Sequence, residues 1–392
     1  MLPFARMVKY GNIKPAPSAN VIKMQAPSAF TNNTLMLQYS NGDLWGIGGN
    51  NAGIFGLGNT TTQTSWVRLM QNVKNFWCTR NSSYSLVQTN DNKFYYAGWN
   101  TWTGASSEVQ STTFVECTSY FSGINIDDIK EIYPNVRNLF VLTNSGVLYA
   151  IGNNSTYELG SSSSMLTELT QVNINVKKVS SFFNSPTWII KNDNSAWRCG
   201  TTTTGTLLTG AASATLTSWT RYDFGTGKYP IDILSHNKML GIVLYSDGTY
   251  PLYGLGSQFY GQLGNGVTTN TNKTALTPQS TYLQLTNVSD FEFIDLHSQS
   301  TRGILYRNGS RIFSTGYNNY GQLGNNSTTN ASVFVQSQLP ISVVFDPETS
   351  MVAANDNALF VYAGGKLYYT GMSPNGTVTG TWTLTEYQLP QF

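Results

Sequence analysis

Short apolar segments separated by turn residues recur along the whole chain. A segment rich in Val, Ile and Phe opens each unit, as at residues 21–24, 73–76 and 129–132. A second apolar segment follows, such as residues 139–142, and then a dipeptide of the kind that forms tight two-residue turns, such as Asn41-Gly42. A third segment ends at a glycine, and a fourth carries an aromatic residue in several units. The pattern predicts four antiparallel strands per unit.

The glycines that end the third strands mark a repeat. They lie 48 to 60 residues apart, at Gly48, Gly98, Gly152, Gly200, Gly256, Gly316 and Gly371. A period near 50 residues is typical of propellers when the repeated unit is all-β. We therefore predict an all-β protein, a seven-bladed β-propeller of four-stranded blades over residues 21–392, after a short N-terminal extension of residues 1–20.

The closure of the predicted ring is left open by the pattern. Residues 21–23 and residues 342–345 both resemble the opening strand of a unit. The repeats are therefore either in phase with the blades, or shifted so that the first and last segments share one blade.

The composition limits the function classes. The 392 residues include 22 Lys and Arg against 20 Asp and Glu, a net charge of +2, and this balance argues against nucleic-acid binding. Charged residues make up 11% and aromatic residues 13% of the chain. The aromatic share supplies enough apolar area for a folded core. No apolar run is long enough for a signal peptide or a membrane span.

Candidate chemistry is sparse. The cysteines Cys78, Cys117 and Cys199 are far apart, which predicts isolated buried thiols, and with His236 and His297 they give no metal-ligand spacing. The histidines occupy the same place in their repeats, which favours a structural role. The acidic clusters are Asp127-Asp128 and Asp290, Glu292 and Asp295; they flank opening strands, where solvated charges are common. We expect no catalytic residues, no metal and no cofactor, and hence a non-enzymatic protein.

The repeat resembles that of the regulator of chromosome condensation family. Its most recognisable stretch, G-x-N-x-x-G-Q-L-G, is near-complete from Gly316 and Gly256, partial from Gly48 and Gly152, and eroded elsewhere. The resemblance implies a seven-bladed propeller over residues 21–390. The namesake of the family is a nucleotide exchange factor for a small GTPase and binds chromatin, using loop residues and basic tails. This chain lacks basic tails, so none of the family's functional residues is carried over.

A second resemblance concerns the N-terminus. Residues 1–12, MLPFARMVKYGN, look like the opening of some tailed-bacteriophage structural proteins. Virion proteins of tailed phages are often rich in Asn, Thr, Ser and Gly and poor in charge, as this chain is. The resemblance implies a virion protein that is made in the host bacterial cytoplasm.

Two groups of residues are candidates for binding. The N-terminal extension is predicted to be either a disordered leader or, as we favour, an arm that docks on other virion proteins through Leu2, Phe4, Arg6, Met7 and Tyr10, because apolar residues in a free leader are poorly explained by disorder. Trp99 and Trp102 follow Gly98, where the glycine motif is lost. We favour the prediction that they fill the loop in place of the missing glycine turn, because aromatic side chains are usually buried. The alternative is that they bind a glycan or a protein partner.

These observations together favour a non-enzymatic structural, connector or decoration protein of a tailed-phage particle, at the neck or collar, tail, fibre junction or capsid surface. We expect several copies in a symmetric assembly, with no nucleic acid and no membrane insertion. The first alternative is an adsorption protein that binds a host-surface glycan or receptor. The second alternative is a cellular regulator of a small GTPase.

Overall fold

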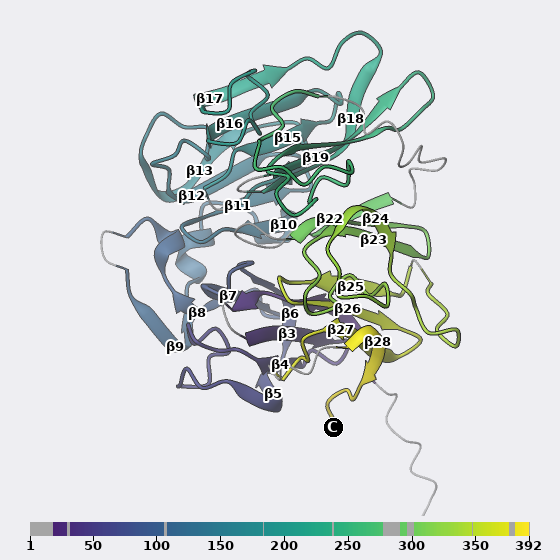
Figure 1. The fold of residues 1–392 in the computed structure, drawn as a ribbon. Helices are drawn as coiled ribbons and strands as arrows, with labels where there is room; N and C mark the ends of the chain where they lie inside the picture. Colours follow the sequence, from purple (N-terminus) through teal and green to yellow (C-terminus); the bar gives the residue numbers. More distant parts are fainter. Residues whose placement is uncertain are drawn as a thin grey trace, which may run out of the picture.

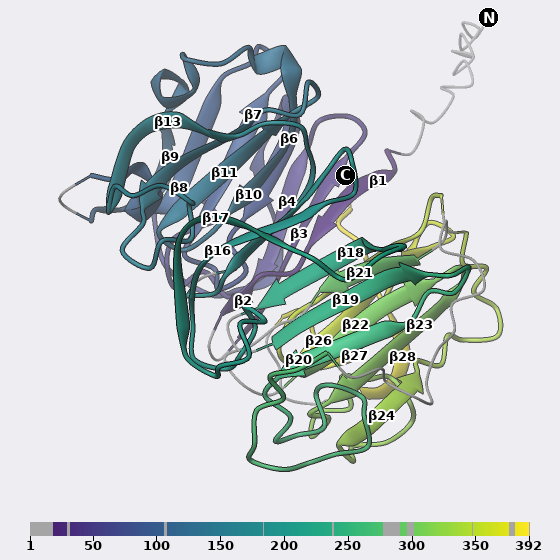
Figure 2. The same ribbon diagram turned by 90° about the horizontal axis from the view of Figure 1, so that it is seen from above.

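The fold consists of seven antiparallel sheets that follow one another along the chain and around a ring (Figure 1). The structure is a computed structural model, and it describes residues 19–29, 32–105, 108–182, 184–236, 239–276, 291–295, 302–346, 348–375 and 381–391. In Figure 2 the purple and blue strands of the first sheets gather on one side, and the green and yellow strands of the last three sheets on the other. The prediction of an all-β, seven-bladed β-propeller is confirmed.

Each blade is a meander of consecutive strands. The first four blades contain β1 (Val21–Gln25), β2 (Ser28–Ala29), β3 (Asn32–Tyr39), β4 (Leu44–Gly48) and β5 (Gln63–Met70); β6 (Val73–Cys78), β7 (Tyr84–Thr89), β8 (Phe94–Trp99) and β9 (Gln110–Glu116); β10 (Ile129–Pro134), β11 (Asn138–Thr143), β12 (Leu148–Asn153) and β13 (Met165–Asn173); and β14 (Val176–Ser180), β15 (Thr187–Lys191), β16 (Ala196–Thr202) and β17 (Ala214–Tyr222). The two-residue strand β2 pairs with β3 beside the meander of the first blade.

The last three blades repeat this plan. They contain β18 (Lys228–His236), β19 (Met239–Ser246) and β20 (Leu252–Gly256); β21 (Phe291–Asp295), β22 (Arg302–Asn308), β23 (Arg311–Gly316) and β24 (Ala331–Gln336); and β25 (Met351–Ala354), β26 (Ala358–Ala363), β27 (Lys366–Gly371) and β28 (Thr381–Tyr387). In the fifth blade an isolated bridge between Gly256 and Lys273 occupies the place of the fourth strand, and residues 277–290 lie outside the described part.

Helical structure is limited to single 3-10 turns. The structure shows η1 (Thr101–Thr103), η2 (Thr118–Phe121) and η3 (Ile126–Asp128), all in the second blade or in its connection to the third. Among the described residues no helix is long and apolar enough to cross a membrane.

The core lies between the blades. Each interface between neighbouring blades holds one hydrophobic cluster in the described part of the chain. Strand β11 shows how one strand serves two interfaces: Leu139 and Val141 pack toward the second blade, and Phe140 and Leu142 pack toward the fourth. Side chains alternate between the two faces of a strand, so a strand buried on both faces is apolar throughout.

The innermost strands share a β-bulge. In β1, β6, β10, β14 and β18 the register shifts at one residue near the start of the strand. The residues just after the shift are polar in all five blades, namely Lys23, Asn75, Glu131, Lys178 and Asp232. The innermost strands of neighbouring blades contact one another around the axis. The bulge therefore directs a polar side chain from each of these strands toward its neighbours.

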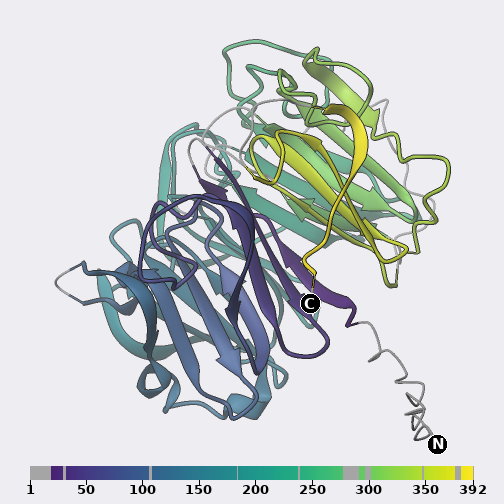
Figure 3. The same ribbon diagram turned by 90° about the horizontal axis from the view of Figure 1, so that it is seen from below.

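The ring closes without exchange of strands between the described parts of the first and last blades. Strand β25 contacts β1, and their side chains share one hydrophobic cluster. The Asn33 amide donates hydrogen bonds to the carbonyl oxygens of Met372, at 2.6 Å, and Ser373, at 3.2 Å. Figure 3 shows the C-terminal segment beside the purple strands of the first blade, where Trp66 Nε1 donates to Gln388 O at 2.8 Å.

The phase of the repeats is thereby settled. Each sheet is formed by consecutive strands, and residues 21–25 open the first blade. The last blade opens at β25, whereas residues 342–345 form no strand, so the interpretation of that segment as an opening strand is corrected. Ala19 and Asn20, assigned to the N-terminal extension, already contact the first blade through the core cluster and through Ser40.

Candidate functional site

The propeller has two different faces. One face, here called the loop face, carries the connections from first to second strand and from third to fourth strand of each blade. The other, here called the turn face, carries the tight turns between second and third strands and the connections between blades. The G-x-N-x-x-G-Q-L-G repeats lie on the loop face, because they follow the third strands β4, β12, β20 and β23.

A side-chain amide closes each well-preserved repeat loop. In the third blade Asn154 accepts a hydrogen bond from Leu159 N at 2.8 Å and donates to the carbonyl oxygens of Ser161 and Ser163, both at 2.7 Å. Asn50 and Asn318 make the corresponding contacts in the first and sixth blades. These bonds explain why the amide recurs at this position of the motif. They satisfy backbone groups of the loop that are shielded from water.

The loops also join neighbouring blades. The last glycine of the motif has a left-handed backbone, and in three blades it lies against an aromatic ring on the outer strand of the next blade. These contacts explain three of the aromatic residues predicted on the fourth strands, and the pairs are Gly56 with Phe114, Gly160 with Trp219, and Gly264 with Phe334. A Cβ atom would collide with the ring in each pair, so only glycine allows this approach.

The anchor glycines have a common backbone conformation. All seven have positive φ values between 90° and 114°. A Cβ atom added to Gly152 would lie 2.4 Å from the carbonyl oxygen of Arg137. The repeated glycine is therefore required where the third strand leaves the sheet.

Four aromatic side chains form a cluster on the loop face. Phe259, Tyr260, Tyr317 and Tyr320 come from the repeat loops of the fifth and sixth blades, and we call them the aromatic cluster. Ring centroids are 4.6 Å apart for Phe259 and Tyr260, 5.6 Å for Tyr260 and Tyr317, and 6.4 Å for Tyr317 and Tyr320. Phe259 is 48% exposed, and the three tyrosines are partly exposed. This is a contiguous aromatic surface from two blades.

The motif glutamines hold the aromatic cluster in place. Gln262 Oε1 accepts from Tyr260 N at 2.6 Å, and Gln322 Oε1 accepts from Tyr320 N at 3.0 Å. Burial, and then the neighbouring Tyr320, raise the pKa of Tyr317. The Tyr317 hydroxyl therefore stays protonated at neutral pH and can donate a hydrogen bond to a partner.

A cavity of about 280 Å³ lies at the loop-face end of the axis. It is lined by residues from the ends of the innermost strands and the segments that follow them, from five blades. These residues are Met24, Gln25, Ala26, Pro27, Trp77, Cys78, Arg80, Glu131, Ile132, Tyr133, Pro134, Ser181, Val352, Ala353 and Ala354. The cavity combines charged, amide, aromatic and aliphatic groups.

Below the cavity lie the polar residues that follow the bulges. Lys23 Nζ donates to Asn75 Oδ1 at 2.7 Å, and Lys178 Nζ lies 3.2 Å from Asp232 Oδ2. Burial lowers the pKa of Lys23, which the charge of Glu131 opposes. Burial raises the pKa of Asp232, which Lys178 opposes. The axis therefore carries charged side chains whose polar partners come from the neighbouring blade.

The structure decides between the two predictions for Trp102: loop packing is confirmed, and the prediction that it binds a glycan or a partner is wrong. Trp102 is fully buried within η1, where its ring packs against Tyr84, Tyr96 and Tyr120. The ring fills the space that the eroded loop leaves open, so it is part of the core. Trp99, at the end of β8, is half-buried, and its glycan-binding role stays a prediction.

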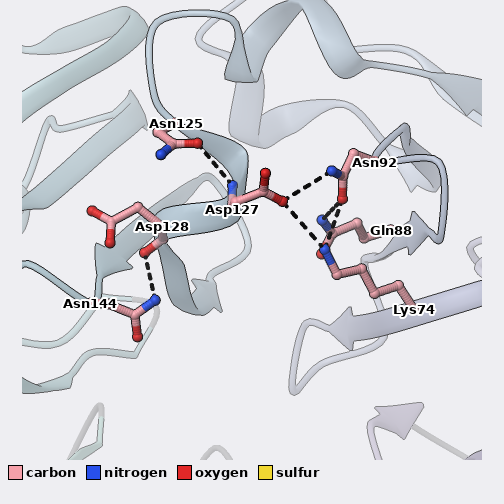
Figure 4. A network of polar contacts seen from close by, with 7 residues as sticks. All are labelled: Lys74, Gln88, Asn92, Asn125, Asp127, Asp128 and Asn144. Carbon is pink, nitrogen blue, oxygen red and sulfur yellow. Dashed lines mark hydrogen bonds and ion pairs between the residues drawn. The ribbon is translucent and has the colours of Figure 1, made fainter.

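The acidic residues serve local structure. Asp127 Oδ1 accepts from Asn92 Nδ2 at 3.1 Å and lies 3.8 Å from Lys74 Nζ, in a network that ties the second blade to the third (Figure 4). Asp128 accepts from Ser145 Oγ at 2.8 Å. Glu292 pairs with Arg307 at 3.0 Å. Asp290 lies outside the described residues, as does the side chain of Asp295.

The remaining candidates fall into two groups. Cys78, Cys117 and Cys199 are buried free thiols, as expected, and burial raises their pKa values, so thiolate chemistry is disfavoured. His236 is buried and stacks on Phe182 at 4.2 Å. His297 and the arm residues Leu2, Phe4, Arg6, Met7 and Tyr10 lie outside the described part. Within the described residues no group of His, Cys, Asp and Glu is suited to hold a metal ion.

Sequence reasoning missed both the aromatic cluster and the cavity. The sequence contained a signal for the aromatic cluster. Phe259, Tyr260 and Tyr320 are aromatic residues at variable positions of the two best-preserved repeats. The cavity had no such signal, since its lining residues come from five blades and meet only when the ring closes.

Comparison with known proteins supports the fold. No family model matches the chain. The structure is similar to that of human WBSCR16, with a TM-score of 0.66 and 15% identity over 89% of this chain and 88% of that one. It is also similar to Prp20p from Saccharomyces cerevisiae, with a TM-score of 0.65 and 14% identity over 91% of this chain and 84% of that one. The chain has an RCC1-like propeller fold. These RCC1-like structures give no support to a virion origin, which stays a prediction.

Proposed function

We propose that this RCC1-like propeller is a non-catalytic regulator that binds a folded protein on its loop face, with the aromatic cluster as the anchor. The observation that carries the proposal is the contiguous exposed surface of Phe259, Tyr260, Tyr317 and Tyr320. Tyrosine and other aromatic residues dominate the binding energy of protein interfaces, because they bury a large area with few rotatable bonds.

The surroundings of the cluster support this role. Its sixth-blade loop is closed by the Asn318 amide, and both loops are held by the glutamine bonds to Tyr260 N and Tyr320 N. A surface whose backbone is already fixed loses little conformational freedom when a partner binds. The aromatic cluster is therefore preorganised for an interface.

A small GTPase is the partner class that we place first. The RCC1-like resemblance of the repeats implies nucleotide exchange, and the similar protein Prp20p has been studied for its binding to Gsp1p and histones. The near-neutral charge of this chain argues against a histone-like partner, which is strongly basic and is bound through acidic surfaces.

The test measures binding and nucleotide release separately. The double variant Phe259→Ala/Tyr260→Ser is compared with Trp382→Ala, which removes an aromatic residue that is 53% exposed on the outer strand of the last blade. We expect the double variant to weaken binding to a small-GTPase panel from the source organism by at least about tenfold, while Trp382→Ala binds as the wild type.

Release of a labelled nucleotide from the bound GTPase then tests regulation. Accelerated release by the wild type, lost in the double variant, supports an exchange factor. Binding without accelerated release limits the role to partner docking. Equal binding by both variants contradicts the aromatic cluster as the anchor. The virion location stays a prediction, which quantitative mass spectrometry of purified particles tests. The docking role of the N-terminal arm also stays a prediction, which a variant truncated before Asn20 tests.

A further inference from the structure

The axial cavity has walls of different chemistry. Arg80, Gln25 and Glu131 contribute a guanidinium, an amide and a carboxylate, whereas Met24, Ile132 and Val352 contribute aliphatic groups. A cavity of about 280 Å³ is at the small end of the volumes that bind organic ligands. The combination suits a small molecule with charged groups at one end and an apolar group at the other.

The donor side is oriented by the neighbouring blade. Gln25 Oε1 accepts from the Cys78 backbone N–H at 2.8 Å and from Cys78 Sγ at 2.9 Å. These bonds fix the amide oxygen on the side of Cys78 and turn the amide N–H groups the other way. Arg80 also lines the cavity, with its guanidinium 5.7 Å from the centroid of Phe182. Two groups that favour a carboxylate thus lie on this wall.

The acceptor side is a carboxylate of the third blade, which the second and third blades orient together. Glu131 Oε1 accepts from Trp77 Nε1 and from Ile132 N, the latter at 3.2 Å. Both bonds use the same carboxylate oxygen, which fixes the side chain of Glu131 where it lines the cavity. The carboxylate lies within the electrostatic influence of Lys23, whose own hydrogen bond goes to Asn75.

We propose that the axial cavity binds a small zwitterion, an α-amino acid with an aliphatic side chain. Its carboxylate contacts Arg80 and the Gln25 amide, its ammonium group contacts Glu131, and its side chain packs against Met24, Val352 and Ala353. Donors and a carboxylate within one cavity match a ligand that carries both charges, since each charge is then paired when water is expelled. The inference is independent of the protein-binding role of the loop face.

The experiment uses the full chain and three matched probes. Leucine carries both charges, 4-methylpentanoate lacks the ammonium group, and 3-methylbutylamine lacks the carboxylate. Isothermal titration calorimetry measures their affinities, with glucose as a neutral polar probe. We expect leucine to bind at least about tenfold more tightly than either analogue, the loss expected when one charge-assisted hydrogen bond is removed.

Variants assign the contacts. Glu131→Gln keeps an oxygen acceptor for Trp77 and Ile132 but removes the charge, so it should abolish the advantage of leucine over 4-methylpentanoate. Arg80→Gln should abolish the advantage over 3-methylbutylamine. Asp232→Asn is the control, because it removes a carboxylate from the axis outside the cavity. Urea unfolding of each variant separates a loss of ligand contacts from a loss of the fold.

Three results overturn the proposal. If leucine binds no more tightly than its analogues, the cavity does not recognise the ammonium and carboxylate groups together. No heat from any probe up to about 10 mM shows that the cavity holds only solvent. Binding of glucose alone assigns the cavity to neutral ligands. None of these results bears on the partner of the aromatic cluster, so failure here is distinguishable from failure of the proposed function.

Discussion

The loops after the third strands of the second and fifth blades perform the same task with different residues. In the fifth blade the loop from Gly256 to Gly264 buries Leu263 and sets its last glycine against Phe334. In the second blade the shorter loop from Gly98 to Gly104 buries Trp102 instead. Both loops thus insert one large apolar side chain between blades.

The second loop also retains the backbone features of the motif. Asn100 occupies the place of the motif asparagine and accepts from Val109 N at 2.6 Å. Gly104 has a φ of 70°, and a Cβ atom there would lie 2.5 Å from Leu166 O in the next blade. The comparison teaches that the interface between neighbouring blades requires a buried apolar residue and a residue with a left-handed backbone. The types of the other residues in the loop can differ.

The largest effect is expected from removing the two buried side chains. Trp102→Ala should lower the free energy of unfolding by about 3–5 kcal/mol, and Leu263→Ala by about 2–5 kcal/mol, because each leaves a cavity between blades. Urea unfolding followed by circular dichroism measures both. A loss below about 1 kcal/mol for Trp102→Ala would contradict the equivalence of the two loops.

Replacing the last glycine of the motif by alanine should lower the free energy of unfolding somewhat less than removing these buried side chains. Gly264→Ala combines a left-handed alanine with a Cβ atom 2.6 Å from the Phe334 ring, so we expect a loss of about 2–4 kcal/mol. Gly365→Ala is the matched control, since Gly365 has a φ of 78° but open space around it. Its loss should be about 1 kcal/mol. Equal losses in the two variants would show that the contact with the next blade is unimportant.

A third test concerns Glu158, which stands where the fifth and sixth blades have Gln262 and Gln322. Burial raises the pKa of Glu158 from 4.5 to about 7, against the opposing hydrogen bonds from Asn138 and Thr156. A raised carboxyl pKa means that the folded state binds the proton more tightly. Stability is therefore lost as the pH rises from about 4.5 to 7, and the loss is complete above 7.

Glu158→Gln should remove this dependence. The variant should be more stable than the wild type by about 3 kcal/mol at pH 8, and nearly equal to it at pH 4.5, as measured by urea unfolding at the two values. If the gain in the free energy of unfolding of Glu158→Gln over the wild type were the same at both pH values, Glu158 would not be buried in its charged form.

The smallest effect is expected at Tyr157. This residue has a φ of 60° at a position where the fifth and sixth blades have Gly261 and Gly321. Asparagine tolerates the left-handed region better than tyrosine, so Tyr157→Asn should gain up to about 1 kcal/mol after the loss of ring contacts. The same unfolding experiment measures it, and a loss above that size would show that the tyrosine ring stabilises the loop.

The sequence predicted those parts of the fold that depend on local chemistry. Turn dipeptides such as Asn41-Gly42 and anchor glycines such as Gly152 determine where strands end, so the number of blades followed from their spacing. The sequence favoured a Trp102 that fills the loop, but its partners could not be predicted, because Tyr84 comes from another strand. The cavity could not be predicted either, because its lining residues come from five blades and the apolar pattern does not reveal how the blades meet.

The way the ring closes has a consequence for synthesis. The other blades are joined to their neighbours by the polypeptide, whereas the described parts of the first and last blades meet through packed side chains and hydrogen bonds such as those of Asn33 and Trp66. A ribosome makes the first blade before the last one. The apolar face formed by Leu35, Leu37 and Ile47 therefore stays exposed until Phe360 and its neighbours have been synthesised. The nascent chain carries a hydrophobic surface in need of protection throughout its elongation.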